Sequence, residues 1–500
     1  MRPAPLLQTV PRPAAHSPLL RLGSAAALIL ALGACATVTP ASQAPRGMPE
    51  RWQAPLPASP EGAAAHGGRV DGLAQWWAQF DDPALVRLIS AAQANNGSVL
   101  QARARIEQAR ASLRSAGAAN LPQVDGGVSA SRATQAAGSI TNSAAVSLDT
   151  LWEIDLFGVG RANRSAALAQ LQASEAAWHD ARVSIAAELA QAYVSYRSCE
   201  QLVQVLQADA TSQRLSADLT ERKVRAGLES PANGALVQAS AANSALSLVG
   251  QQSQCEVQIK SLVALTALPE AEVRQLLGAG AAVLPQPRAF AVEVLPAQWL
   301  TQRPDLRNLE RQAAAALRDV DAAQADRWPR LTLSGSISRA RVSGVGGAPT
   351  SFANTWSVGP ALSLPIFDAG RRSAAVDQAR ARYDEIRSQY EQRARDAVRE
   401  VEEALVKLDA AQRREADART AATGFAAFLE AQRKRTEAGA GSLLDLEDAR
   451  RTALSAQSSL INIQTERIQA WISLYRAVGG GWSLDTAVAS AATPASPAIR

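Results

Sequence analysis

Few side chains in this 500-residue sequence are of the kinds that carry out chemistry. The three histidines and three cysteines leave little material for a metal site, and His179, within a long helical pattern, has no cysteine or second histidine nearby. Neighbouring acids such as Glu402 and Glu403 point to different sides of a helix, so they cannot act as a catalytic pair. The glycine-rich run 344–347 lacks the lysine and helix of a phosphate-binding loop. The sequence therefore predicts no enzyme, no cofactor and no metal site.

Asp445 and Asp448 are spaced three residues apart, so both project from one face of a helix. Two structural roles would account for them. Ser442 is placed to cap the helix with Asp445 three residues on, as in a capping box. Asp448 is placed to form an ion pair with Arg451 one turn along. Spacing alone favours these structural roles.

Cys35 stands at the end of an export signal. Arg21 precedes an apolar run over residues 22–32, which is too short to span a membrane, and two small residues follow it. The stretch Leu-Gly-Ala-Cys over residues 32–35 resembles a bacterial lipobox, where cleavage leaves the cysteine as a lipidated first residue. A plain cleaved signal with an incidental cysteine is the alternative.

The residue after the cysteine bears on the destination of the chain. An aspartate there commonly retains Gram-negative lipoproteins in the inner membrane, and Ala36 favours the outer membrane instead. We therefore expect a signal peptide over residues 1–34 and lipidation of Cys35. The following residues, to about 72, are rich in proline, alanine and glycine and predict an extended tether over 35–72.

The other two cysteines are symmetric about a predicted turn. Cys199 and Cys255 each lie 28 residues from Gly227. In an antiparallel helical hairpin that turns there, their sulfur atoms come to nearly the same height, and an exported chain meets oxidising conditions. A Cys199–Cys255 disulfide is the resulting hypothesis, and two buried free thiols are the alternative.

The helices and strands that must position these residues occur in two copies along the chain. Matched segments recur at offsets of about 210 residues: 120–124 with 328–331, 155–161 with 365–371, and 225–228 with 437–440. Each half therefore repeats one plan, which is a helix, two strands, a long helix, a turn and a returning helix.

Alternation of apolar and polar residues predicts the strands, over residues 123–130, 146–154, 331–338 and 358–366. Such segments suit a transmembrane barrel, although a half-buried hairpin has the same pattern. Long helices are predicted by an alanine-rich composition with 4% aromatic residues. The 67 residues from Gly160 to Gly227 would make a rod of about 100 Å.

The distribution of charge argues against a nucleic-acid-binding protein. The 51 basic and 46 acidic residues give a net charge of +5, and the two signs are interspersed. This pattern is typical of solvated helix faces and has no concentrated basic surface for nucleic acid.

Five motifs in this order resemble the TolC-like outer membrane factors, in particular the lipoprotein branch (NodT-like) that serves RND-type efflux pumps. The resemblance covers about Leu73 to Trp482. It is carried by residues 76–83 (Trp-Trp-Ala-Gln-Phe-Asp-Asp-Pro), 152–158 (Trp-Glu-Ile-Asp-Leu-Phe-Gly), 303–306 (Arg-Pro-Asp-Leu), 364–371 (Leu-Pro-Ile-Phe-Asp-Ala-Gly-Arg) and 479–482 (Gly-Gly-Gly-Trp).

The resemblance implies a homotrimer in which each protomer gives four strands to a 12-stranded β-barrel in the outer membrane. A long periplasmic α-helical barrel would continue it, with uninterrupted helices over about 160–227 and 370–438. The implied function is a passive duct exporting small molecules, such as drugs, from the periplasm. A periplasmic adaptor (membrane fusion) protein and an inner-membrane RND-type transporter would be its partners.

The expected domain organisation follows from the same match. It comprises repeat 1 over residues 73–267, an equatorial linker over 268–300, repeat 2 over 301–482 and a disordered tail over 483–500. Residues near 408–430 would join the linker in a collar around the tunnel.

The family's periplasmic aperture lies at the helix tips, where acidic side chains ring the pore. Matching Gly439 to the family's glycine implies that Asp445 and Asp448 are those acids. The first-repeat tip, residues 230–233, carries no matching acids, so gating would be asymmetric. An alternative of another class is a lipid-anchored periplasmic coiled-coil scaffold without a pore, which leaves the paired amphipathic strands unexplained.

Overall fold

Long helices and one sheet make up the part of the chain that the structure describes. The structure is a computed structural model, and it describes residues 52–55, 76–134, 140–278, 282–286, 300, 303–344 and 350–480. The predicted signal peptide, Cys35 and the predicted tail lie outside these residues. None of the described helices is both long enough and apolar enough to cross a membrane.

The elements repeat the plan that the sequence predicts. In chain order they are η1 (Trp76–Phe80), α3 (Pro83–Asn95), α4 (Gly97–Ala118), β1 (Gln123–Thr134), β2 (Ile140–Ile154), α5 (Val159–Arg225), α6 (Pro231–Thr266), α7 (Glu270–Gly278), α8 (Pro304–Ala325), β3 (Arg330–Gly344), β4 (Ser351–Ser363), α9 (Arg371–Glu437) and α10 (Leu443–Ala477). Helix α7 and residues 282–286 fall within the predicted linker.

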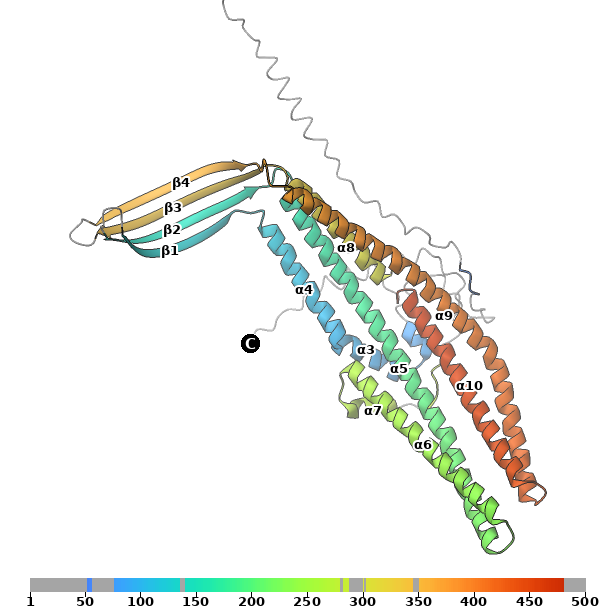
Figure 1. Cartoon of the computed structure of the whole chain (residues 1–500). Helices are drawn as coiled ribbons and strands as arrows, with labels where there is room; N and C mark the ends of the chain where they lie inside the picture. The colour runs from blue at the N-terminus through green and yellow to red at the C-terminus, as the bar shows by residue number, and fades with distance from the viewer. Residues whose placement is uncertain are drawn as a thin grey trace, which may run out of the picture. The chain divides into compact units, whose positions relative to one another are not determined.

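The two long helices are confirmed, and both run without interruption for 67 residues. Shorter helices fill the space beside them, as Figure 1 shows. Near the sheet the helices pack in the order α4, α5, α8, α9, and farther from it in the order α6, α5, α10, α9. Helix α5 therefore contacts helices of both repeats along its length. The predicted collar segment 408–430 is part of the continuous helix α9.

An aspartate fixes the start of each long helix and explains one of the repeated motifs. Asp155 accepts hydrogen bonds from the backbone N–H groups of Gly158 (2.8 Å) and Arg161 (2.9 Å). Asp368 accepts corresponding bonds from Gly370 (3.1 Å) and Arg372 (3.2 Å). These carboxylates satisfy N–H groups that have no partner within the helix. The motif thus turns the chain from strand to helix in both halves.

The four strands form one antiparallel sheet in the order β1-β2-β3-β4. Pairing of β2 with β3 joins the two repeats, with Ile154 opposite Leu331. The prediction that the last strand reaches residue 366 is wrong, because β4 ends at Ser363 opposite Arg330. The reason lies in the neighbouring strand, since Pro329 precedes Arg330 and has no N–H group to extend the ladder.

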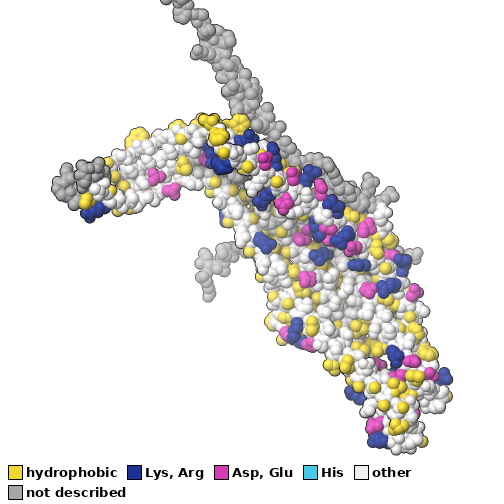
Figure 2. All heavy atoms as spheres, viewed as in Figure 1, with side chains coloured by type: hydrophobic (Ala, Val, Ile, Leu, Met, Phe, Trp, Pro, Cys, Tyr) yellow, Lys and Arg dark blue, Asp and Glu magenta, His cyan; other side chains and the backbone are white. Residues whose placement is uncertain are grey.

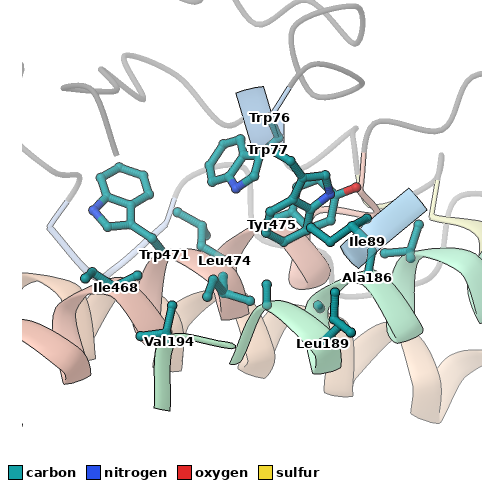
Figure 3. Packing of buried hydrophobic residues seen from close by; sticks show 14 of the residues in the cluster. Trp76, Trp77, Ile89, Ala186, Leu189, Val194, Ile468, Trp471, Leu474 and Tyr475 are labelled. Atoms are coloured by element: carbon teal, nitrogen blue, oxygen red, sulfur yellow. The ribbon is translucent and has the colours of Figure 1, made fainter. Parts of the chain in front are cut away.

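The hydrophobic core lies where η1, α3, α5 and α10 meet (Figure 3). The ring of Trp77 meets that of Tyr475 edge-on at 4.7 Å, and the ring of Trp76 lies 6.1 Å from that of Trp471. Residues 52–55, inside the predicted tether, also reach this region, since the N–H groups of Gln53 and Ala54 each donate to Glu402 at 2.7 Å. That short part of the predicted tether is therefore packed against helix α9.

A disulfide joins Cys199 of α5 to Cys255 of α6, with 5.6 Å between their Cα atoms. Helices α5 and α6 turn back on each other at Gly227, whose φ of 69° lies in the left-handed region. The hairpin therefore brings the two cysteines to the same height, as their equal spacing from the turn predicts.

Candidate functional site at the helical hairpin tips

The two helical hairpins turn at the same end of the described chain, opposite the sheet (Figure 1). At each turn a glycine follows the helix with a positive φ, 69° at Gly227 and 76° at Gly439. The next residue closes the helix, because Leu228 N donates to Lys223 O at 2.8 Å and Ala440 N donates to Arg435 O at 2.9 Å. Glycine adopts this conformation without steric cost. The repeated glycine thus gives both repeats the same tip.

Asp445 and Asp448 lie on the exposed surface of the second tip, in the first two turns of α10. Ser442 caps this helix. Its Oγ accepts a hydrogen bond from the backbone N–H of Leu444 at 3.2 Å, one residue before the position that a capping box uses. Asp448 forms an ion pair with Arg451 at 3.4 Å, and their side chains are 60% and 77% exposed. An ion pair that is this exposed contributes little to the stability of the fold. Both carboxylates therefore remain accessible to ions or to other chains.

Directly behind these aspartates lies a buried polar cluster, here called the tip network, formed by Gln213 of α5 with Glu447 and Arg450 of α10. Gln213 Nε2 donates to Glu447 Oε2 at 2.7 Å, and Arg450 Nη1 donates to Glu447 Oε1 at 2.9 Å and to Gln213 Oε1 at 3.1 Å. Arg450 Nη2 donates to the hydroxyls of Ser212 and Ser216 at 3.1 and 2.8 Å. Glu447 and Arg450 are only 5% and 7% exposed.

The tip network ties the two repeats together. Because it connects α10 of repeat 2 to α5 of repeat 1, it fixes the helix that carries Asp445 and Asp448 against the rest of the chain. The sequence alone did not identify these residues as part of a site. The three-residue spacing of Glu447 and Arg450 is a weak signal for a pair, and it does not reveal that the pair is buried against another helix.

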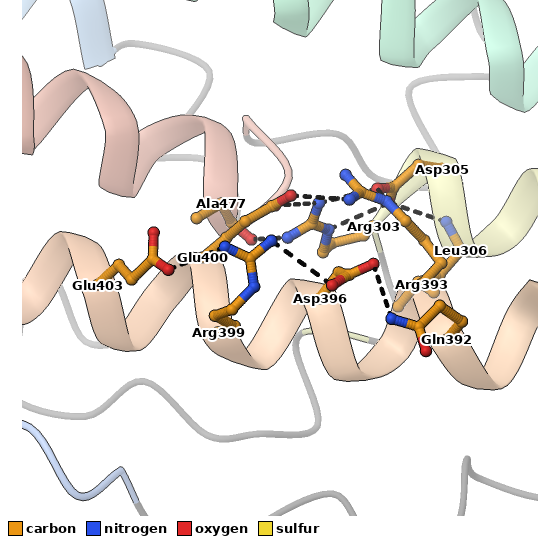
Figure 4. A network of polar contacts seen from close by, with 10 residues as sticks. All are labelled: Arg303, Asp305, Leu306, Gln392, Arg393, Asp396, Arg399, Glu400, Glu403 and Ala477. Carbon is orange, nitrogen blue, oxygen red and sulfur yellow. Dashed lines mark hydrogen bonds and ion pairs between the residues drawn. The ribbon is translucent and has the colours of Figure 1, made fainter.

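A second buried cluster, here called the Arg303 network, lies between α8, α9 and α10 (Figure 4). Arg303 donates from Nη1 to the carbonyl of Ala477 (2.7 Å) and from Nη2 to Asp305 and Glu400 (2.8 Å each). Arg393 donates to the same two carboxylates, at 2.6 and 2.7 Å. Burial by itself would raise the pKa of Asp305, but the two guanidinium groups hold it below its usual value.

The motif Arg303-Pro304-Asp305 is therefore more than a helix start. Pro304 opens α8, and Asp305 lies in its first turn. In addition, Arg303 caps the carbonyl end of α10 and joins it to α9. This network holds the start of α8 and the C-terminal end of α10 against the middle of α9.

His179 of α5 is buried, and this sets its titration. Burial first, and the charge of Arg182 second, lower the pKa of His179 to about 4. Its ring lies 4.8 Å from the ring of Trp178. Among the described residues no cluster of histidine, cysteine or acidic groups could hold a metal ion.

Acidification from pH 7 to pH 5 is expected to destabilise the protomer by roughly 2 kcal/mol through His179. The folded state keeps this histidine neutral, whereas the unfolded chain takes up a proton at its ordinary pKa near 6.5, so the stabilisation is present above about pH 6.5 and is lost as pH falls toward 4. Denaturant unfolding at both pH values, compared with His179→Gln, measures the effect. Burial and the charge of Asp305 raise the pKa of Asp180, so protonation of this carboxyl favours the folded state as pH falls. This opposing effect is the same in both proteins. Equal pH dependence in the two proteins would contradict the assignment.

Comparisons with known proteins agree with this architecture. A family profile described as "Outer membrane efflux protein" matches residues 88–268 and 295–480, one segment in each repeat. The solvent efflux pump outer membrane protein SrpC of Pseudomonas putida is 30% identical over 91% of this chain and 97% of its own length. Outer membrane protein OprJ of Pseudomonas aeruginosa is 32% identical over 92% of this chain and 95% of its own length.

Among solved structures, the outer membrane protein VceC of Vibrio cholerae has a TM-score of 0.71 and 25% sequence identity. The match covers 82% of this chain and 99% of that one. The profile matches both repeats, and this chain matches the two relatives over nearly their whole lengths. On these grounds the chain belongs to the outer membrane efflux protein family.

Proposed function

We propose that this chain is the outer-membrane channel of a tripartite efflux pump, a passive trimeric duct that exports small molecules from the periplasm. One observation carries the proposal, namely a four-stranded sheet whose described outer strands are exposed on both faces, continued by helices of about 100 Å. Side chains of β1 and β4 are exposed nearly throughout. In water such a sheet would leave its apolar side unprotected, whereas a membrane covers it.

The trimer follows from the edges of the sheet. Among the described strands, β1 and β4 each have one neighbour, which leaves a row of backbone groups unpaired on either side. Hydrocarbon cannot satisfy such groups, so a spanning sheet must close on itself. Three copies placed edge to edge would give a closed barrel of 12 strands, within the size range of outer-membrane barrels.

The faces of the sheet suit this closure. Hydroxyl groups pair across one face, with Ser131 to Ser143 at 2.7 Å and Ser338 to Thr355 at 2.7 Å. The other face carries exposed apolar side chains such as Leu148. We assign the hydroxyl-rich face to a water-filled lumen and the apolar face to lipid.

Partners supply the energy in this proposal. The relatives SrpC and OprJ are an efflux pump component and an outer membrane protein, and another relative is named for antibiotic efflux in Pseudomonas putida. We propose that this chain likewise exports toxic small molecules, together with a periplasmic adaptor and an inner-membrane RND-type transporter. The protein itself is a channel component and not an enzyme.

We further propose the processing and organisation that the sequence predicts. Residues 1–34 would be removed, Cys35 would carry lipid, and the two repeats would span 73–267 and 301–482 around a linker. The disulfide between α5 and α6 would staple the first hairpin in the oxidising periplasm.

Asp445 and Asp448 form the periplasmic aperture in this proposal. Their exposure and the threefold arrangement would set six carboxylates around a constriction, and rings of acids favour cations. We expect wild-type protein in planar bilayers to give discrete openings selective for cations. Asp445→Ala/Asp448→Ala should lower the preference for cations several-fold and raise conductance.

A matched control is Glu221→Ala, which removes an exposed, ion-paired acid near the first tip. This variant should behave as the wild type. Unchanged conductance and selectivity in the double aspartate variant would remove both residues from the aperture. If neither the wild type nor the double aspartate variant shows channel openings, the result would favour a scaffold without a pore.

A further inference from the structure

Three arginines lie close together at the end of the sheet farthest from the helices, where Figure 2 shows basic side chains. The register puts them on one face. Arg132 is opposite Asn142, which is opposite Ser343, while Arg341 and Arg339 on the same strand are opposite Ala144 and Val146. Residues directly opposite one another, and residues two apart, share a face of a sheet.

This face is the one that the proposed duct turns toward lipid. Along β3 it presents Leu331, Leu333, Gly335 and Ile337, and then changes character to Arg339, Arg341 and Ser343. Exposed apolar side chains from the other strands extend the first part into a band: Val128, Val146, Leu148, Trp356, Val358 and Leu362. Arg339 therefore lies at the edge of the apolar band, level with Val128 and Val146, and Arg341 and Arg132 lie just beyond it.

The width of the band places the arginines at a membrane boundary. Eight residues separate Leu331 from Arg339, about 27 Å along the strand at the usual rise. With the tilt usual in barrels this is roughly 20 Å of height, close to the ~25 Å apolar band of outer-membrane proteins. Because the helices leave the sheet on the periplasmic side, the arginines reach the polar level of the outer leaflet.

Within the described sheet, no carboxylate shares this face with the three arginines. The acids of the sheet, Asp125, Asp149 and Glu153, alternate onto the opposite face. The connecting segments 135–139 and 345–349 contain no acidic residue in the sequence. Within the described residues, the ring of Phe352 is the neighbour of two of the guanidinium groups, each 5.9 Å from its centroid.

Two of the three arginines, Arg132 and Arg341, line a shallow hollow of about 450 Å³ together with Asn142 and Ser343. Guanidinium, amide and hydroxyl groups are all hydrogen-bond donors, and arginine in particular matches the oxygen atoms of phosphate. A ligand that reaches this hollow from the membrane must be anionic at its head and apolar in its body.

We propose that Arg132, Arg339 and Arg341 bind the phosphate groups of a phosphorylated glycolipid in the outer leaflet of the outer membrane. The proposal rests on the proposed duct, since it requires this face of the sheet to meet lipid. The apolar band would contact the acyl chains, and the hollow would receive a sugar phosphate. Three such sites would surround the closed barrel.

The test compares the full-length mature protein with Arg132→Gln/Arg339→Gln/Arg341→Gln. Both proteins are purified in detergent, freed of lipid and titrated with diphosphorylated lipid A, and native mass spectrometry counts the bound glycolipid. We expect the glutamine variant to bind at least tenfold more weakly. The lysine triple variant, which keeps the charge, should recover part of the binding. Equal binding by the wild type and the glutamine variant overturns the proposal.

Two competitors distinguish the source of the phosphate. Dephosphorylated lipid A and inorganic phosphate should each fail to displace the bound glycolipid, and displacement by either at equal concentration overturns the proposal. Conductance in phosphatidylcholine bilayers is recorded in parallel. A wild type without channel activity counts against the duct, whereas weak glycolipid binding by a wild type that conducts counts against this site alone.

Discussion

Replacing Arg303 by alanine is expected to destabilise the protomer by about 3–5 kcal/mol, which is within the range for breaking a buried ion pair. The side chain is 3% exposed and contacts Asp305, Glu400 and the carbonyl of Ala477. Its removal leaves two carboxylates sharing Arg393 and leaves the end of α10 without its donor. Denaturant unfolding of the purified protein, followed by helical circular dichroism, measures the loss.

Arg399→Ala is the matched control for this variant. Arg399 lies on α9 and, like Arg303, has two acidic partners, Asp396 and Glu403, but its side chain is 59% exposed. Its loss should change the free energy of unfolding by less than about 0.5 kcal/mol. Arg303→Lys should recover little, because an ammonium group cannot reproduce the forked contacts of guanidinium. Similar losses for Arg303→Ala and Arg399→Ala would show that burial does not decide the contribution.

Replacing Arg450 by alanine should release helix α10 from α5 at the tip. Glu447 would be left buried with Gln213 as its remaining partner in the tip network. A loss of about 3 kcal/mol in this contact raises the population of the separated state roughly 100-fold. Hydrogen exchange over residues 443–453 should accelerate correspondingly, and openings in planar bilayers should become more frequent.

Arg451→Ala supplies the comparison for Arg450→Ala, one residue along the same helix. Its side chain is 77% exposed and pairs only weakly with Asp448. We expect this variant to leave exchange over 443–453 unchanged. Replacing Gln213, Glu447 and Arg450 together by Leu, Leu and Met should restore slow exchange, since no unpaired charge remains. Fast exchange in the triple variant would mean that packing volume, and not charge, holds the tip.

Local patterns in the sequence were sufficient for the elements of the fold. Period-two alternation and its recurrence after about 210 residues identified all four strands, and the glycines at 227 and 439 located both hairpin turns. The equal spacing of Cys199 and Cys255 from a turn was also enough to pair them, because a hairpin converts sequence distance into height.

Burial of polar side chains could not be predicted in the same way. Arg303 has the pattern of a helix start, and Arg450 that of an exposed charge on a helix, yet both are buried by helices from distant parts of the chain. Which face of α5 meets α10 depends on packing, and no local pattern specifies it. The role of Asp445 and Asp448 could not be predicted from local patterns for a different reason. The environment proposed for them is formed by three copies of the chain.

The pairing of β2 with β3 has a consequence for how the chain must mature. Partners such as Ile154 and Leu331 are separated by more than a third of the polypeptide, so the first hairpin of strands emerges long before its neighbour does. Nonlocal pairing of this kind is slow, and strands waiting with open edges are prone to aggregate. We therefore expect residues 123–154 to be the segment most prone to aggregate until the second hairpin of strands is available to pair with it.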